Sequence, residues 1–293
     1  MKKTIYAGQQ INVRYRKLGI YIILAMVLAL AVNWFGVTLM IGPKNRKIEQ
    51  WKGKAKVSNV EIETADGIKI RGWWVAGNEA VSVVLFHGIQ GNRSDMRERI
   101  DHFSGKGYSV AVFDFRGHGE SDKSSISFGL NESNDVDCAV EWVRKQRPGD
   151  RIFLLGQSMG AASIAMSNVM GKVDAIIFEQ MYYDLDSAIK NRITARLGEW
   201  SGFSSFLFSW QAEFRFGRMG SQINTHSKLA EIETPKIFIG GKSDVSARPW
   251  EIEACYKKAR EPKTIIMFEG VGHVDMAKKL GQAYFKEIDQ IIK

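Results

Sequence analysis

The clearest pattern along the chain is one long run of apolar residues near its N-terminus. Residues 18–42 contain no charged side chain, and only Asn33 and Thr38 among them are clearly polar. About 20 apolar residues are enough for a helix to cross about 30 Å of hydrocarbon. Tyr21 and Trp34 stand where interfacial aromatic residues are common. The run therefore predicts a transmembrane helix.

A cleaved signal peptide is the alternative interpretation of this run, since Ala29-Leu30-Ala31 resembles a cleavage site. Apolar sequence continues for ten residues past that site, which favours an uncleaved anchor. A basic tail, residues 1–17, precedes the anchor. A polar, basic linker, residues 43–56, follows it and is expected to form a stalk that faces solvent or lipid headgroups.

Beyond the linker, residues 57–293 alternate between short apolar runs and helical patterns. Residues 57–63 and 68–75 alternate in polarity around a turn and predict an antiparallel hairpin. Further strands are predicted at residues 81–86, 108–114, 152–155, 175–178, 236–239 and 264–268. Helices are predicted at residues 94–104, 132–146, 249–259 and 276–292. This order predicts an α/β fold with a mostly parallel sheet covered by helices on both sides. Ligands bind such sheets beyond the carboxyl ends of the strands.

One interval, residues 182–233, breaks this alternation and predicts a helical cap insertion. Its aromatic and aliphatic residues share one helical face, which consists of Phe203, Phe206, Leu207, Trp210 and Phe214. Such a face can pack the cap onto the core, and part of it can also line an apolar pocket or touch lipid.

The net charge of +9 is concentrated at the N-terminus. Residues 1–60 hold eleven Lys and Arg against one acid, whereas the remaining residues hold 30 basic and 31 acidic side chains. A nucleic-acid partner is therefore not expected, because it would require basic residues on the folded body. Cys138 and Cys255 have no disulfide framework and no metal-ligand spacing, and they are expected to be core or surface thiols. No cofactor is expected for this chain.

Membrane orientation follows from the basic residues that flank the anchor. Five precede it and six follow within about fifteen residues, so the local count does not decide. Long domains cross membranes largely regardless of charge, so the short basic tail should decide the topology. The tail is expected inside and residues 57–293 on the extracytoplasmic side.

The segment with the strongest chemical signal is Gly156-Gln157-Ser158-Met159-Gly160. It follows the predicted strand 152–155 and precedes a helix start rich in small residues. A G-x-S-x-G motif in this context is typical of a nucleophile elbow, which lifts a serine hydroxyl above the end of a sheet. The sequence therefore predicts Ser158 as the nucleophile.

A serine nucleophile needs a base within hydrogen-bond reach, and five histidines are available. His273 lies in a glycine-flanked loop directly after the last predicted strand, on the ligand side of the sheet, and is the expected base. The other four are expected to shape loops or to lie in ordinary helix or cap positions: His87, His102, His118 and His226.

The acid that orients the base is expected to be Asp244, which follows the strand at residues 236–239. The order Ser158, Asp244, His273 is the one found in α/β-hydrolases. Glu179 and Asp184, after the preceding strand, are the rival carboxylates. The oxyanion is expected to be bound by two backbone N–H groups, those of Met159 and Ile89.

Several ordered motifs together resemble the α/β-hydrolase superfamily over residues 57–293. They are Gly156-Gln157-Ser158-Met159-Gly160, His87-Gly88-Ile89-Gln90-Gly91-Asn92, Asp114-Phe115-Arg116-Gly117-His118-Gly119, Asp244 and Gly272-His273. Within the superfamily the chain resembles membrane-anchored members of the prolyl-oligopeptidase-like or lysophospholipase-like kind. The resemblance implies cleavage of ester, thioester or amide bonds through an acyl-enzyme, without a metal. Ile89 and Gln90 replace two glycines of the His-Gly-Gly-Gly loop of many lipases.

The leading hypothesis is a membrane-anchored serine hydrolase that cleaves a carboxylic ester, with lipids and lysophospholipids among the candidate substrates. The same site could instead cleave peptides or transfer an acyl group to another acceptor. A catalytically inactive, membrane-tethered binding scaffold is the alternative of a different class, and the complete serine, acid and base set counts against it.

Overall fold

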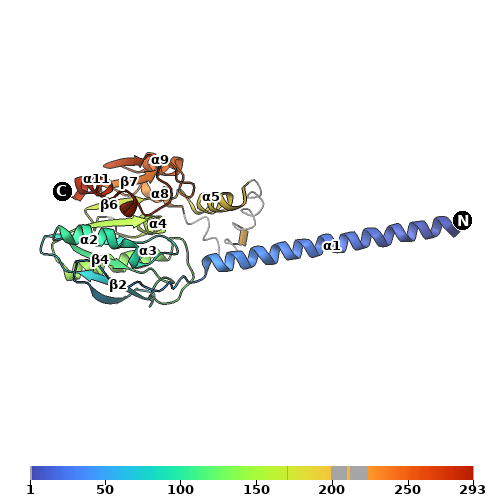
Figure 1. The fold of residues 1–293 in the computed structure, drawn as a ribbon, viewed down its shortest axis with the longest axis horizontal. Helices are drawn as coiled ribbons and strands as arrows, with labels where there is room; N and C mark the ends of the chain where they lie inside the picture. Colours follow the sequence, from blue (N-terminus) through green and yellow to red (C-terminus); the bar gives the residue numbers. More distant parts are fainter. Residues whose placement is uncertain (1, 170, 199–209, 212–223, 293) are drawn as a thin grey trace.

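The computed structural model describes residues 2–169, 171–198, 210–211 and 224–292. A body built around one sheet carries a single long helix, α1 (Lys2–Ile41), that projects from it (Figure 1). The chain's N-terminus lies at the far tip of α1, and its C-terminus lies on the opposite side of the body. The projecting helix and the sheet body correspond to the predicted anchor and the predicted α/β domain.

The body is organised around an eight-stranded sheet in the order β1-β2-β4-β3-β5-β6-β7-β8. Neighbours from β4 to β8 pair in parallel, whereas β1 pairs with β2, and β2 with β4, in antiparallel fashion. The strands are β1 (Ser58–Glu63), β2 (Lys69–Val75), β3 (Val81–Phe86), β4 (Ser109–Phe113), β5 (Arg151–Gln157), β6 (Ala175–Glu179), β7 (Lys236–Gly241) and β8 (Lys263–Phe268). The predicted hairpin and mostly parallel sheet are confirmed.

Helices cover both faces of this sheet because strand side chains alternate between two cores. In β3, Val84 and Phe86 face one core, and Val83 and Leu85 face the other. The first core is closed by α3 (Glu132–Gln146), α4 (Met159–Met166), α8 (Thr225–Leu229) and α9 (Pro249–Lys258). The second is closed by η1 (Arg93–Met96), α2 (Arg97–Gly105), α10 (Met276–Leu280) and α11 (Gln282–Ile292). A buried strand of this kind needs apolar residues on both faces, as the sequence pattern indicated.

One predicted helix differs from the structure at the C-terminus. Residues 276–292 were expected to form one helix, but the chain forms α10 and α11 with Gly281 between them. Gly281 has a φ of 54°, a left-handed conformation that glycine adopts at little cost, and it ends α10 there.

The predicted cap interval is described in part. Helix α5 (Leu185–Leu197), Trp210, Gln211 and α8 belong to it. Of the predicted aromatic face only Trp210 is described, and it is half exposed. The other members of that face lie outside the described residues: Phe203, Phe206, Leu207 and Phe214.

The candidate membrane span within α1 is Tyr15–Ile41. This stretch of 27 residues is long and apolar enough to cross a membrane. A membrane span and a signal sequence both fit this helix. Its side chains are almost all exposed, apart from Val37 and Ile41, which are buried against the body.

The linker after α1 lies on the body and does not form the free stalk that its composition predicted. Trp51 packs edge-on against Trp73, with ring centroids 5.4 Å apart, and Arg97 donates hydrogen bonds to the carbonyls of Glu49 and Gln50. From residue 51 onward, alternate residues turn inward, and Trp51 and Ala55 pack against the second core while Lys52, Lys54 and Lys56 face solvent. A period of two had therefore hidden an apolar docking side within a basic segment.

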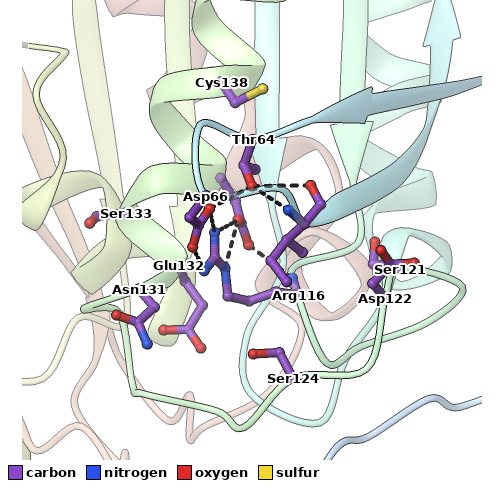
Figure 2. Close-up of polar contacts among 12 residues, drawn as sticks. Thr64, Asp66, Arg116, Ser121, Asp122, Ser124, Asn131, Glu132, Ser133 and Cys138 are labelled. Atoms are coloured by element: carbon purple, nitrogen blue, oxygen red, sulfur yellow. Dashed lines mark hydrogen bonds and ion pairs between the residues drawn. The ribbon is translucent and has the colours of Figure 1, made fainter.

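A buried arginine joins the loop after β4 to two other elements (Figure 2). The Arg116 guanidinium donates to Asp66 in the β1–β2 turn at 2.9 Å and to Asp135 of α3 at 2.8 Å. Thr64 donates a further hydrogen bond to Asp66 at 2.6 Å. Burial raises the pKa of Asp135 to about 7, against the opposing effect of Arg116. Arg116 therefore has a structural part in the Asp-Phe-Arg-Gly-His-Gly motif.

Candidate active site

The turn from β5 into α4 holds Ser158 in a backbone conformation that side chains rarely adopt. Its φ is 52° and its ψ is −110°, and its N–H donates to the carbonyl of Glu179 at 2.8 Å. Both flanking glycines are required by space. A Cβ on Gly156 would lie 2.4 Å from the carbonyl carbon of Gly160, and a Cβ on Gly160 would lie 2.4 Å from the carbonyl oxygen of Phe86. This is the strained strand-to-helix elbow that the motif predicted.

The Ser158 side chain is buried, yet its Oγ makes no hydrogen bond with any residue that the structure describes. Buried hydroxyls normally have a partner, so an unpaired one points to a group that acts on something else. Ser158 lines a pocket of about 710 Å³, and His273 lines the same pocket.

His273 and Asp244 come together from the loops after β8 and β7. The Nδ1 of His273 lies 2.8 Å from Oδ2 of Asp244, whose side chain is fully buried. The other carboxylate oxygen, Oδ1, accepts the N–H groups of Ser246 at 2.8 Å and Ala247 at 2.9 Å. Asp244 is thereby fixed in one orientation, and it selects the His273 tautomer that has its proton on Nδ1 and an acceptor at Nε2.

The rival carboxylates are engaged elsewhere. Both oxygens of Glu179 accept hydrogen bonds from the guanidinium of Arg99 at 2.7 Å, and both side chains are fully buried. Asp184 caps the N-terminus of α5 by accepting the N–H of Ser187 at 2.7 Å. The geometry thus brings Asp244, and neither rival, onto His273.

The two predicted oxyanion donors lie in the loop after β3 and at the start of α4. Ile89 lines the pocket, and Met159 is the first residue of α4, directly after Ser158. A Cβ on the neighbouring Gly88 would lie 3.5 Å from the Cβ of Ser158, an ordinary van der Waals distance, so this loop passes directly beside the nucleophile. Gln90, which follows Ile89, has a φ of 63°, and this conformation turns the loop sharply past the pocket.

Two buried histidines hold that loop in place. His87 Nδ1 lies 2.7 Å from the carbonyl of Gly88, and its Nε2 accepts the N–H of Phe115 at 3.1 Å. His118 Nδ1 lies 3.0 Å from the carbonyl of Arg116, and its Nε2 accepts the N–H of Gln90 at 3.4 Å. Each ring donates at one nitrogen and accepts at the other, so each is neutral. The loop-shaping part expected for both residues agrees with these contacts.

Acid should weaken this arrangement in a direction fixed by the pKa of His87, which burial lowers from 6.5 to about 4. The stability that neutral His87 contributes is complete above pH 6.5 and is lost as the pH falls toward 4, because the unfolded chain takes up the proton first. At about 1.4 kcal/mol per pH unit, the loss between pH 6.5 and 5 is about 2 kcal/mol.

We expect the difference in unfolding free energy between the wild type and His87→Asn to shrink by about 2 kcal/mol when the pH falls from 6.5 to 5. Urea titrations at the two pH values measure it. Comparing the two proteins removes the contributions of titrating groups that lie away from His87. A difference that stays constant with pH would show that His87 does not titrate as its burial requires.

Sequence reasoning missed two residues that connect the site. Arg99 Nη1 donates to Asp275 at 2.8 Å, so one guanidinium joins Glu179 behind the nucleophile to the loop that carries His273. Gln180, with a φ of 50°, donates from Nε2 to the carbonyl of Gly272 at 2.9 Å. A positive φ in a non-glycine residue is visible only in three dimensions, and Arg99 lies in a helix that looked ordinary.

Three groups of residues line the pocket. The first is Ser158 and His273, and the second is the apolar set Phe128, Leu185 and Ile189 of the body. The third belongs to α1 and consists of Gly36, Leu39 and Met40. Within the described residues no group of three or more His, Cys, Asp or Glu side chains could hold a metal ion.

Comparison with known proteins agrees with this geometry. A family model described as serine aminopeptidase, S33 matches residues 77–181, which include the elbow. The uncharacterized protein Rv2307c of Mycobacterium tuberculosis is 26% identical over 277 residues, covering 89% of this chain and 90% of that protein. An α/β hydrolase domain-containing protein of Arabidopsis thaliana, WAV2, is 23% identical over 242 residues, covering 78% and 76% of the two chains.

Among solved structures, the esterase Pf2001 of Pyrococcus furiosus superposes with a TM-score of 0.71 at 24% identity, covering 86% of this chain and 97% of that one. At this level of identity the likeness is one of fold. It confirms the predicted α/β-hydrolase fold.

Proposed function

We propose that this chain, a serine hydrolase of the α/β-hydrolase superfamily, cleaves carboxylic esters through an acyl-enzyme on Ser158. The observation that carries the proposal is the Asp244–His273 hydrogen bond at 2.8 Å, formed beside a pocket that His273 shares with the strained Ser158. A buried carboxylate that orients an imidazole beside the pocket of a serine hydroxyl is the set of groups that serine acyl transfer requires.

Each group has a definite part in the proposed reaction. His273 accepts the Ser158 proton at Nε2 as Oγ bonds to the ester carbonyl carbon, and the N–H groups of Ile89 and Met159 donate to the oxyanion. His273 then gives the proton to the departing alcohol, which leaves an acyl-enzyme. Water, deprotonated by His273 in turn, releases the acid and restores Ser158. A hydrogen bond from Ser158 Oγ to His273 Nε2 is expected to form when substrate binds, since catalytic hydrogen bonds are often long or misaligned in sites without substrate.

The finer features of the proposal concern substrate and location. The apolar residues that line the pocket, Phe128, Leu185 and Ile189, favour an acyl chain, and hence a lipid or lysophospholipid ester. We place the enzyme on the membrane through α1, with the body on the extracytoplasmic side. A protease added outside intact cells should then digest the body.

A peptidase is the second candidate, supported by the description of the family model that matches residues 77–181. Purified full-length enzyme from the membrane fraction should be assayed against p-nitrophenyl esters of increasing chain length and against aminoacyl p-nitroanilides, with Ser158→Ala as the blank. We expect ester hydrolysis that Ser158→Ala lacks, and little anilide hydrolysis. Cleavage of the anilides alone would replace the esterase proposal by the peptidase.

A further inference from the structure

The end of the predicted anchor is part of the active-site pocket. Gly36, Leu39 and Met40 of α1 line the same pocket of about 710 Å³ as Ser158 and His273. These three residues lie within five positions of one helix, so they present one continuous face to the cavity. A helix whose only task was to tether the body would have no reason to line the pocket.

This face of α1 is held on the body by apolar packing. Val37 is fully buried and Ile41 is 8% exposed, in a cluster with Phe128, Leu185 and Ile189. The last three residues also line the pocket. The same packing that holds α1 therefore builds one side of the cavity.

Hydrogen bonds fix the position of the helix further. The carbonyl of Ile41 accepts the N–H of Ile126 at 2.8 Å, and the N–H of Lys44 donates to the carbonyl of Gly117 at 2.6 Å. Eight residues before Ile41, the Asn33 carboxamide accepts a hydrogen bond from Gln211 of the cap interval at 2.6 Å. The helix end cannot swing away without breaking these bonds, so they hold this wall of the pocket in place.

The length of the apolar segment indicates where this wall lies relative to a membrane. Its uncharged part, from Leu18 to Ile41, has 24 residues, which at about 1.5 Å each extend about 36 Å, whereas the hydrocarbon layer is about 30 Å thick. About four residues are therefore in excess. Because the body is attached at the C-terminal end, the excess corresponds to residues 38–41, which include Leu39 and Met40 of the pocket-lining face. Lys44 and Arg46 follow directly and also line the pocket.

We infer that the substrate is a long-chain acyl ester taken from the membrane, whose acyl chain lies along Gly36, Leu39 and Met40 while its carbonyl carbon reaches Ser158. The inference rests on the proposed hydrolysis of lipid esters and adds the surface that binds the acyl chain and the route by which the substrate enters. In this arrangement α1 is both the anchor and a substrate-binding wall. A chain leaving the bilayer along α1 passes directly from lipid to an apolar pocket, without crossing water.

Gly36 offers a sharp test, because no atom of the described residues beyond its own stretch of helix lies within 4 Å of the position that a Cβ would take there. Gly36→Leu should therefore fill pocket space without displacing the backbone. Gly19→Leu is the matched control, since Gly19 lies in the same helix and its Cβ position is equally open. Full-length proteins in phosphatidylcholine vesicles should be assayed with p-nitrophenyl palmitate in the bilayer and with p-nitrophenyl butyrate in solution.

We expect Gly36→Leu to lower the ratio of kcat/KM for palmitate to that for butyrate by about tenfold or more, with no change of the ratio in Gly19→Leu. A ratio within twofold of the wild type in Gly36→Leu would overturn the inference. Wild type that is folded but hydrolyses neither ester would instead refute the proposed function itself. The two failures are therefore distinguishable.

A second measurement does not depend on how Gly36→Leu folds. A fluorophosphonate with a long alkyl chain and a terminal diazirine should be attached to the wild-type enzyme in the same vesicles and then irradiated. Crosslinks to residues 36–40 are expected. Crosslinks found only on the body, away from α1, would contradict the proposed path of the acyl chain.

Discussion

Replacing Asp244 with asparagine is expected to lower kcat for ester hydrolysis by about 10⁴-fold while leaving the fold intact. The new side chain keeps an oxygen that can accept the N–H groups of Ser246 and Ala247, as Oδ1 now does. Its amide nitrogen then faces Nδ1 of His273 and donates to it, so the ring must carry its proton on Nε2. A protonated Nε2 cannot accept the proton of Ser158.

Asp184→Asn is the matched control for this substitution, because asparagine also caps helices and the Asp184 side chain caps α5 through the N–H of Ser187. Its kcat should stay within a few-fold of the wild type. Steady-state kinetics, together with thermal unfolding of each variant, separates loss of catalysis from loss of structure. Equal losses of kcat in the two variants would contradict the proposal that Asp244 orients His273 for catalysis.

Replacing Arg99 with methionine should have the largest effect on stability, about 3–5 kcal/mol of unfolding free energy. Arg99 and Glu179 are both fully buried, and the substitution would leave the Glu179 carboxylate buried without its cation. Tyr284 would still donate to Glu179 at 2.6 Å, but a hydroxyl does not replace a charge. The Asp275 contact near His273 would also be lost.

Urea unfolding in detergent micelles measures this loss, with Arg260→Met as the control. Arg260 pairs with Glu233 on the surface, where both side chains are more than half exposed, so its loss should cost no more than about 1 kcal/mol. Adding Glu179→Gln to Arg99→Met should recover part of the stability, because the uncompensated charge is then removed. A loss in Arg99→Met no greater than that in Arg260→Met would contradict the account of a buried ion pair.

The features that sequence reasoning predicted share one physical property, which is that each is encoded locally. Buried strands appear as apolar runs, the elbow as glycines two positions from a serine, and the positions of Asp244 and His273 as loops after strands. Parallel strands bring all of these loops to one edge of the sheet. That is why residues 86 and 115 positions after Ser158 could be assigned to its neighbourhood.

What sequence reasoning missed depends on packing between distant segments. The linker was expected to be a free stalk because its lysines dominate its composition, yet Trp51 and Ile48 dock it on the body. Arg99 meets Glu179 across 80 positions of sequence, and no local pattern marks either residue as a partner. The contribution of Gly36 to the pocket could not be predicted for the same reason. An apolar helix near the N-terminus has the pattern of an anchor whether or not its end packs against the active site.

The central claim is that Ser158 is an activated nucleophile, and covalent labelling tests it most directly. Folded full-length wild type should be incubated with a fluorophosphonate probe at neutral pH, digested and analysed by mass spectrometry. The account predicts one adduct, on the peptide that contains Ser158, with labelling abolished in Ser158→Ala and strongly slowed in Asp244→Asn. Folded wild type that stays unlabelled, or labelling that persists in Ser158→Ala, would contradict it.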